Sequence, residues 1–106
     1  MSEDRYAMVL TSVGSEEEAE NLASGLVEHR LAACVQRTRI TSHYMWKGVA
    51  TKSDEILMLI KTKTVKVAAI QEYIENHHSY DTPEVVVLAV TTGSAKYLRW
   101  IDEALG

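Results

Sequence analysis

The start of the chain carries one apolar run followed by one amphipathic stretch. Residues 6–13, YAMVLTSV, are rich in strand-forming side chains and predict a buried strand. Ser15 precedes three glutamates, which is the pattern of a helix N-terminus where serine caps the backbone and the dipole favours negative charge. Apolar residues then recur at helical spacing, so we expect a helix from residue 16 to about residue 29.

The middle of the chain changes to a period of two, which is typical of strands. Residues 34–46 alternate in this way and predict one long strand. Because the stretch is long for a single strand, we expect a bend or bulge within residues 36–39. Residues 48–53 are expected to form a turn or loop, and the apolar run 54–62, DEILMLIKT, predicts a second strand. The two strands together predict a long antiparallel hairpin.

The remainder of the chain predicts a helix, a strand and a final helix. Thr64 is expected to cap the first of these helices, which ends within residues 76–83, where Asn, Ser, Asp and Pro disfavour continuation. The run 85–90, VVVLAV, is strongly apolar and predicts a central strand. Ser94 is expected to cap the final helix. The expected inward positions of the two helices are Val67, Ile70 and Ile74, and then Tyr97, Leu98 and Ile101.

This order of elements predicts an α+β fold. It is the βαββαβ arrangement of the ferredoxin-like sandwich, with an antiparallel sheet and an added C-terminal helix. Two helices cover one face of such a sheet and leave the other face bare. The side chains expected to be available on the strands are Tyr44, Trp46, Ile56, Met58 and Ile60. Monomeric proteins seldom expose so large an apolar patch, so we expect self-association, with Tyr44 and Trp46 at or near the subunit interface.

Length and charge narrow the classes of function. A chain of 106 residues and 11.9 kDa predicts one domain spanning residues 1–106. Fifteen acidic and eleven basic residues give a net charge of −4, which argues against a nucleic-acid partner. Residues 1–4 are acidic with no apolar signal region after them, and no apolar run approaches the ~20 residues of a membrane span. We therefore expect a cytoplasmic protein without a membrane partner.

His77 and His78 form the one cluster of metal-ligand type in the sequence. Imidazole nitrogen suits copper, zinc and nickel. Adjacent residues on a regular helix point about 100° apart, so both bind one ion only if the helix unravels here, which Ser79 and Pro83 favour. The alternative is a helix C-terminus, where a histidine faces the negative end of the dipole. Glu84 is either a further ligand at this corner or a carboxylate that accepts backbone hydrogen bonds.

Other residues with reactive side chains lack neighbours that would complete a site. Cys34 is the single cysteine, so it forms no internal disulfide, and with small apolar neighbours it is expected to behave as a small hydrophobe. His29 and His43 are isolated and are expected at the surface or in packing. No glycine-rich phosphate loop is present. No catalytic residue is therefore assigned.

Five short motifs occur together in the order and near the spacing of a known family. They are LAAC at 31–34, TSHYMWKG at 41–48, LIKT at 59–62, HSYDTPE at 78–84 and YLRW at 97–100. With these motifs the sequence resembles the CutA divalent-cation tolerance proteins over essentially its whole length. The resemblance implies a ferredoxin-like fold, a homotrimer, a cytoplasmic location and a link to tolerance of copper and other divalent metals. It implies no known enzymatic reaction.

The resemblance also implies a metal site that this chain matches only in part. In the family, the proposed copper ligands are a cysteine at the end of the first strand and a histidine pair at the end of the second helix. The pair corresponds to His77 and His78, whereas the cysteine position falls at Thr11. Without a thiolate, we expect at most an imidazole–carboxylate site that binds Cu(II) or another divalent cation weakly, with Glu84 or a neighbouring subunit's residue as further ligands.

A second hypothesis comes from a different class of protein. The chain is also similar in expected architecture to the nitrogen-regulatory PII proteins, which implies a trimeric signalling or scaffold module with a small ligand or protein partner in clefts between subunits. An acylphosphatase-like enzyme would need a phosphate-cradling loop with an arginine, and residues 12–15 contain none. Fold analogy alone does not choose between the metal-binding and scaffold hypotheses.

Overall fold

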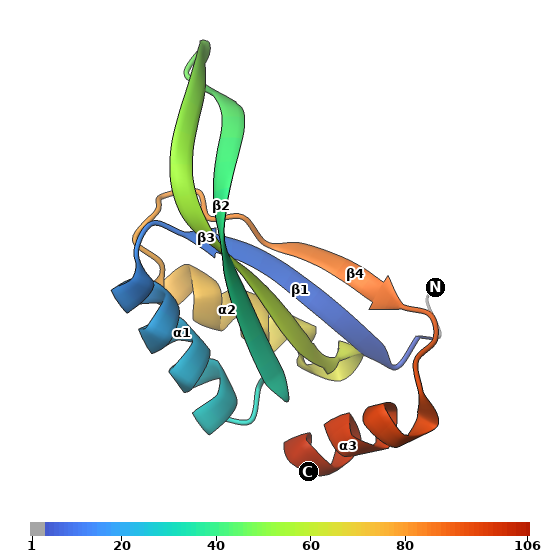
Figure 1. Cartoon of the computed structure of the whole chain (residues 1–106). Helices are drawn as coiled ribbons and strands as arrows, with labels where there is room; N and C mark the ends of the chain where they lie inside the picture. The colour runs from blue at the N-terminus through green and yellow to red at the C-terminus, as the bar shows by residue number, and fades with distance from the viewer. Residues whose placement is uncertain (1–3) are drawn as a thin grey trace.

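The protein is described by a computed structural model, in which residues 4–106 are described here, so the predicted acidic segment 1–4 lies outside the described residues except for Asp4. The elements are β1 (Tyr6–Val13), α1 (Glu16–Glu28), β2 (Cys34–Trp46), β3 (Val49–Lys63), the short 3-10 helix η1 (Thr64–Lys66), α2 (Val67–His77), β4 (Val86–Val90) and α3 (Ala95–Leu105). Figure 1 shows them as one twisted sheet with helices α1 and α2 against one face. The strands pair antiparallel in the order β2-β3-β1-β4, which confirms the predicted α+β fold.

The core lies between the sheet and helices α1 and α2. Alternate residues of β1 and β3 point into it, and α1 and α2 contribute their apolar stripes. The fully buried large side chains among them are Val9, Val13, Leu26, Met58, Ile60, Ile70 and Ile74. The predicted start of α1 is confirmed, because the Ser15 hydroxyl accepts a hydrogen bond from the Glu18 backbone N–H at 3.1 Å.

The assignment of β3 side chains to the bare face was wrong by one position. Ile56, Met58 and Ile60 face the helices and are buried in the core. A period of two says which residues share a face, but it does not say which face the helices cover. The opposite face, called here the open face, carries the alternate residues of the same strands. Its apolar members are Met8, Leu10, Leu57, Leu59, Val86 and Leu88, all half-buried or exposed.

Strands β2 and β3 form a hairpin that projects beyond the sheet (Figure 1). The predicted loop at 48–53 is wrong, because the turn is only Lys47–Gly48 and β3 begins at Val49. Both turn residues have positive φ, 49° and 79°, which gives a tight two-residue turn that matches the strand twist. The predicted bulge at 36–39 is also wrong, since the pairing runs without interruption from Cys34↔Lys61 to Trp46↔Val49. Strand β2 is therefore one continuous, twisted strand over all 13 of its residues (Figure 1).

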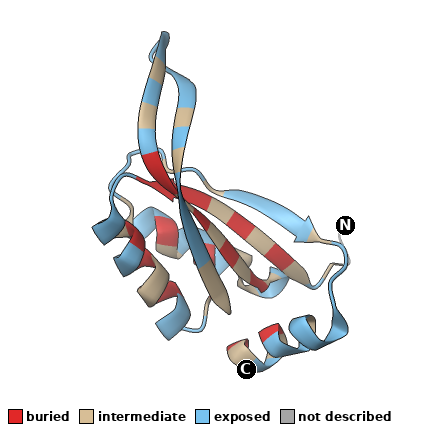
Figure 2. Cartoon of the chain, in the orientation of Figure 1, coloured by how far each residue is buried: buried red, intermediate tan, exposed pale blue. Residues whose placement is uncertain are grey.

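The predicted central strand is an edge strand. Strand β4 pairs only with β1, and its Val86, Val87 and Leu88 side chains are each more than two-fifths exposed. Figure 2 shows β4 and the projecting hairpin largely in the exposed colour, whereas β1 and the lower part of β3 carry buried positions. The apolar run therefore predicted the strand correctly but not its place in the sheet. Apolar residues show that a strand is buried only when another layer of the protein covers it. Trp46 is also half exposed, at 51%.

The final two helices differ in how well the sequence predicts them. Thr64 does not cap α2, because its hydroxyl donates to the Asp4 carbonyl at 2.8 Å and a 3-10 turn precedes the helix. Ser94 does cap α3, accepting from the Tyr97 N–H at 3.3 Å. On α3, Ile101 is buried as predicted, but Tyr97 is 39% exposed.

Helix α3 docks at one end of the open face through a small polar cluster. The Tyr6 hydroxyl donates to Asp102 Oδ2 at 2.8 Å, and Lys63 Nζ lies 3.3 Å from Asp102 Oδ1. The hydrogen bond from Tyr6 and the neighbouring ammonium of Lys63 hold the pKa of Asp102 below its usual value. Among residues 4–106, no helix is long and apolar enough to cross a membrane.

Candidate functional site

The C-terminal end of α2 forms a corner against the start of α1. Ser79 ties the two together, because its backbone N–H donates to Glu18 Oε2 at 2.8 Å and its hydroxyl donates to Oε1 at 2.9 Å. His77 is the last residue of α2, and His78 already has extended backbone angles, φ −92° and ψ 143°. The helix therefore ends between the two histidines, which lets their side chains serve different purposes.

His77 presents one free ring nitrogen to solvent. Its Nδ1 lies 2.8 Å from the Tyr73 carbonyl oxygen, so Nδ1 carries the proton and donates it. Its ring stacks on Tyr73 with centroids 4.0 Å apart and an angle of 19° between planes. In the neutral tautomer that this hydrogen bond selects, Nε2 carries the lone pair, and a backbone-oriented imidazole of this kind is how proteins commonly present a histidine to a metal.

His78 is a structural residue in this conformation. Its side chain is fully buried, and Nε2 donates to the Ser12 carbonyl oxygen at 2.7 Å. Its Nδ1 accepts a hydrogen bond from the Tyr80 backbone N–H at 3.0 Å. Both ring nitrogens are therefore engaged, and His78 ties the loop after α2 to the end of β1 while offering no lone pair to a metal.

A cleft of about 650 Å³ runs between α1 and α2 beside this corner. Glu17, Glu18 and Asn21 line it from α1, while Tyr73 and His77 line it from α2. Glu18 is already engaged by Ser79, and across residues 4–106 no group of three or more His, Cys, Asp or Glu side chains is placed to hold a metal ion. Within one described chain, the corner thus offers a single imidazole in an acidic cleft.

Glu84 lies in a different cavity from the two histidines. It lines a groove of about 590 Å³ between the loop after α2 and the hairpin, together with Glu55, Tyr80, Tyr44 and Trp46. The structure therefore brings His77 and His78 to one corner but does not bring Glu84 into the same cleft.

Glu55 and Tyr80 form the polar centre of this groove, and sequence reasoning missed both. The Tyr80 hydroxyl donates to Glu55 Oε2 at 2.9 Å, and the Ser12 hydroxyl donates to the same oxygen at 3.4 Å. Burial, followed by the hydrogen bond to Glu55, raises the pKa of Tyr80 to about 12. Glu55 is only 9% exposed. The available signal was a carboxylate directly before the apolar residues 56–60 of β3, since carboxylates are rarely buried without partners.

Thr11 stands on the helix-covered face, where the family resemblance implied a cysteine. It is fully buried, and its Oγ1 is within reach of no hydrogen-bond partner in the described chain. A hydroxyl is a poor substitute for a thiolate toward a soft metal, so this position offers no site for Cu(I).

The other residues singled out from the sequence lie apart from the corner. Cys34 is half-buried on β2 and pairs in register with Lys61. His43 lines the groove of Glu55. His29 ends α1 with the same geometry as His77, since its Nδ1 lies 2.8 Å from the Gly25 carbonyl oxygen, but it does not line the α1–α2 cleft.

Comparison with known proteins adds a consistent family assignment. Residues 7–104 match the family model described as CutA1 divalent ion tolerance protein. The chain is 41% identical to the divalent-cation tolerance protein CutA of Thermus thermophilus, over 93% of this chain and 97% of that protein. It is 43% identical to a CutA homologue of Xenopus laevis over 80% of this chain, but spans only 57% of that longer protein. The solved structure of the periplasmic divalent cation tolerance protein CutA from Archaeoglobus fulgidus superimposes with a TM-score of 0.93, at 34% identity and covering 95% of this chain and 99% of that one.

Proposed function

The chain belongs to the CutA1 divalent ion tolerance family, and from that premise we propose that it is a cytoplasmic homotrimer that binds divalent cations weakly and catalyses no reaction. The ion in this proposal is Cu(II) or another divalent cation. Weak binding follows from the donor set, since one imidazole with carboxylates nearby is far from a complete coordination sphere.

The open face supports the trimer. It combines apolar residues from β1, β3 and β4, and within residues 4–106 the edge strand β4 has no partner on its outer side. An apolar face and an open edge are both features that a second copy removes from water. The half-exposed Trp46 and Tyr44 on the hairpin are the large aromatic anchors expected of such an interface.

His77 carries the metal part of the proposal. The single supporting observation is its geometry: Nδ1–H is held by the Tyr73 carbonyl, and His77 lines a cleft that Glu17 and Glu18 also line. The other two predicted ligands, His78 and Glu84, are less suited to bind a metal than His77. His78 would have to release two hydrogen bonds before it could bind a metal, and Glu84 would have to be joined by ligands from another chain.

Calorimetric titration with Cu(II) and with Zn(II) tests the metal proposal. His77→Ala is expected to weaken binding about tenfold or more, because it removes the one free imidazole of the cleft. His29→Ala is the matched control, since His29 has the same helix-end geometry outside the cleft and its removal is expected to leave affinity unchanged. Binding is also expected to weaken in acid, because imidazole must be deprotonated to ligate. Equal affinity in wild type and His77→Ala, or equal loss in both variants, would contradict the proposal.

The scaffold hypothesis stays a second candidate because of the groove around Glu55. A groove of about 590 Å³ along the projecting hairpin, with aromatic and carboxylate walls, is a suitable place for a small ligand. If metal titration gives no specific binding while the trimer is intact, the scaffold hypothesis replaces the metal one.

A further inference from the structure

Glu18 is the carboxylate of α1 that meets the end of α2. Its Oε2 accepts the Ser79 backbone N–H at 2.8 Å, and its Oε1 accepts the Ser79 hydroxyl at 2.9 Å. Ser79 lies two positions after His77, and all three residues line the cleft between the two helices. Only 17% of the Glu18 side chain is exposed. The loop after α2 therefore holds a largely covered carboxylate at the corner where His77 lies.

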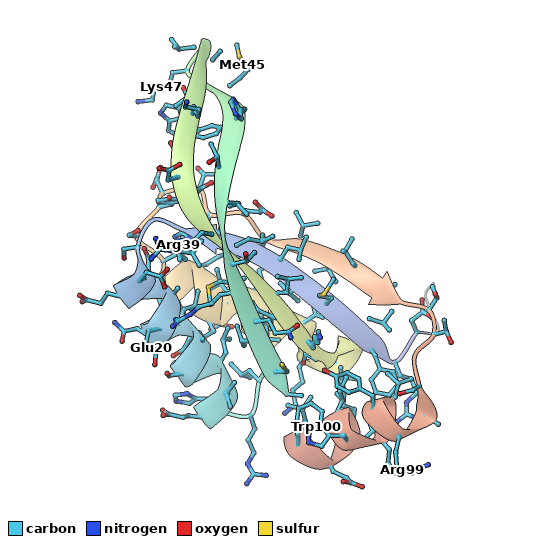
Figure 3. All side chains as sticks on the ribbon, in the orientation of Figure 1. Glu20, Arg39, Met45, Lys47, Arg99 and Trp100 are labelled. Atoms are coloured by element: carbon cyan, nitrogen blue, oxygen red, sulfur yellow. The ribbon has the colours of Figure 1, made fainter. Side chains whose placement is uncertain are left out.

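Two neighbouring carboxylates of α1 are neutralised by arginines of β2. Glu16 Oε1 lies 3.1 Å from the Nε of Arg39, which reaches α1 near the start of the helix (Figure 3). Glu20 Oε2 lies 3.1 Å from Nη1 of Arg37. Glu18 differs, because none of the ion pairs described for residues 4–106 joins it to a lysine or an arginine. No basic side chain in contact with Glu18 therefore offsets its negative charge.

Neutral groups surround the Glu18 carboxylate instead. Both donors of Ser79 are neutral. His78 Nδ1 lies 3.5 Å from Glu18 Oε2, but this nitrogen accepts the Tyr80 backbone N–H and so presents a lone pair rather than a proton. A covered carboxylate among neutral groups interacts more strongly with a divalent cation than with those groups, because opposite charges attract strongly where water is partly excluded.

We propose that Glu18 is the second ligand of the cation site at His77, and that Ser79 masks this carboxylate until an ion binds. The inference rests on the proposed function, since it assigns the partner of His77 within the same cleft. Glu18 leaves Ser79 and then shares the ion with His77. An imidazole and a carboxylate suit Cu(II) or Zn(II). Because two hydrogen bonds to Ser79 must be broken first, masking also contributes to the weakness of binding.

The opposite role for Ser79 is to orient Glu18 toward the ion, as outer hydrogen bonds often do for metal ligands. The engagement of both carboxylate oxygens and the small exposure of the side chain favour masking. The two roles predict effects of opposite sign. Loss of a masking hydrogen bond tightens binding of the ion, whereas loss of an orienting one weakens it.

Calorimetric titration of Ser79→Ala with Zn(II) distinguishes the two roles. This variant removes the hydroxyl and keeps the backbone N–H. It is expected to tighten binding about threefold to tenfold, because the ion no longer competes with that hydrogen bond. Ser79→Thr keeps both donors and is expected to bind as the wild type does. A variant that merely loosened the corner would not bind the ion more tightly.

Removal of the carboxylate tests Glu18 itself. Glu18→Gln is expected to weaken Zn(II) binding about tenfold or more, and Ser79→Ala is expected to have no effect on affinity in that background. Glu17→Gln is the matched control, because it removes the same charge from the preceding position of the same cleft, about 100° round the helix. It is expected to change affinity less than about twofold.

Hydrogen exchange of the Ser79 amide gives a measurement that is independent of affinity. This N–H is one of the two groups that Glu18 releases, so Zn(II) is expected to speed its exchange. The Ala19 amide, which donates to the Ser15 carbonyl at 3.1 Å, is the internal control and is expected to stay protected.

The possible failures of this inference and of the proposed function are distinguishable. If His77→Ala leaves Zn(II) affinity unchanged, the proposed function itself is wrong. If His77→Ala weakens binding but Ser79→Ala also weakens it or leaves it unchanged, the cation site stands and masking is overturned. Equal weakening by Glu17→Gln and Glu18→Gln would mean general charge attraction, and Glu18 would then not be a ligand.

Discussion

The two faces of the sheet are built from alternate residues of the same strands, yet they differ sharply in burial. On the covered face, Val9 and Val13 of β1 and Ile60 of β3 are fully buried beneath α1 and α2. On the open face, Leu59 of β3 and Leu10 of β1 are only half-buried, and β4 beside them is exposed (Figure 2). The side chains are equally apolar, so the difference lies in what covers them.

This difference supports the proposal that the chain folds around one face and assembles through the other. Fully burying a leucine or isoleucine side chain contributes about 1.5 to 3 kcal/mol. The covered face obtains this contribution within one chain. The open face, apart from the end where α3 docks, obtains it only if another copy covers it.

The largest expected effect comes from truncating one residue on each face. Ile60→Ala is expected to lower the free energy of unfolding by about 2 to 5 kcal/mol without changing the assembled mass, because it leaves a cavity in the core. Leu59→Ala is expected to promote dissociation at low protein concentration, because in the proposed trimer a neighbouring copy covers this side chain. Urea unfolding and sedimentation of both variants measure the two effects. The comparison fails if Leu59→Ala changes folding stability as much as Ile60→Ala and leaves assembly unaffected.

A smaller effect is expected at two buried threonines of the covered face. Thr11 Oγ1 has no hydrogen-bond partner among residues 4–106, whereas the Thr62 hydroxyl donates to the Leu31 carbonyl at 2.7 Å. Thr11→Val is therefore expected to stabilise the protein by about 1 kcal/mol, and Thr62→Val to destabilise it by a similar amount. Thermal unfolding of the two variants decides the matter. Destabilisation by both would mean that the Thr11 hydroxyl does have a partner, and stabilisation by both would mean that the Thr62 hydrogen bond does not stabilise the fold.

The smallest expected effect is the pH dependence of the free energy of unfolding that comes from Tyr80, which lines the same groove as Glu55. The pKa of Tyr80 is raised to about 12 in the folded chain, above the 10.0 of an unperturbed tyrosine. The unfolded chain therefore loses the phenol proton first, and this contribution to stability is complete below about pH 10 and falls as the pH rises toward 12. Chemical unfolding across this range is expected to show that decline. Tyr80→Phe removes this component, and an unchanged decline in that variant would assign it to other groups.

Local signals in the sequence predicted the helices and strands well. They could not predict which face of each strand packs against the helices. Ser15 and the glutamates after it specify the start of α1, because capping depends only on neighbouring residues. The faces of β3 were reversed, and β4 was placed centrally, because alternation and apolar content do not say where the helices pack.

The candidate site was predictable only in part, for a related reason. The helix end between His77 and His78 follows from local residues, but the role of His78 depends on the Ser12 carbonyl, 66 positions away. Glu55 and Tyr80 form their hydrogen bond across 25 positions, and no local pattern connects them. Long-range hydrogen bonds decide whether a polar residue is structural or free to bind a ligand.

Sedimentation equilibrium tests most directly the claim that the open face is an assembly surface. The account predicts a mass near three times the chain mass of 11.9 kDa for the wild type. Leu59→Asp, on the open face, is expected to shift the population toward single chains. Val65→Asp adds the same charge at an apolar residue that is 84% exposed in η1 and away from that face, and is expected to leave the mass unchanged. A wild-type protein that sediments as a single species of 11.9 kDa would contradict the account.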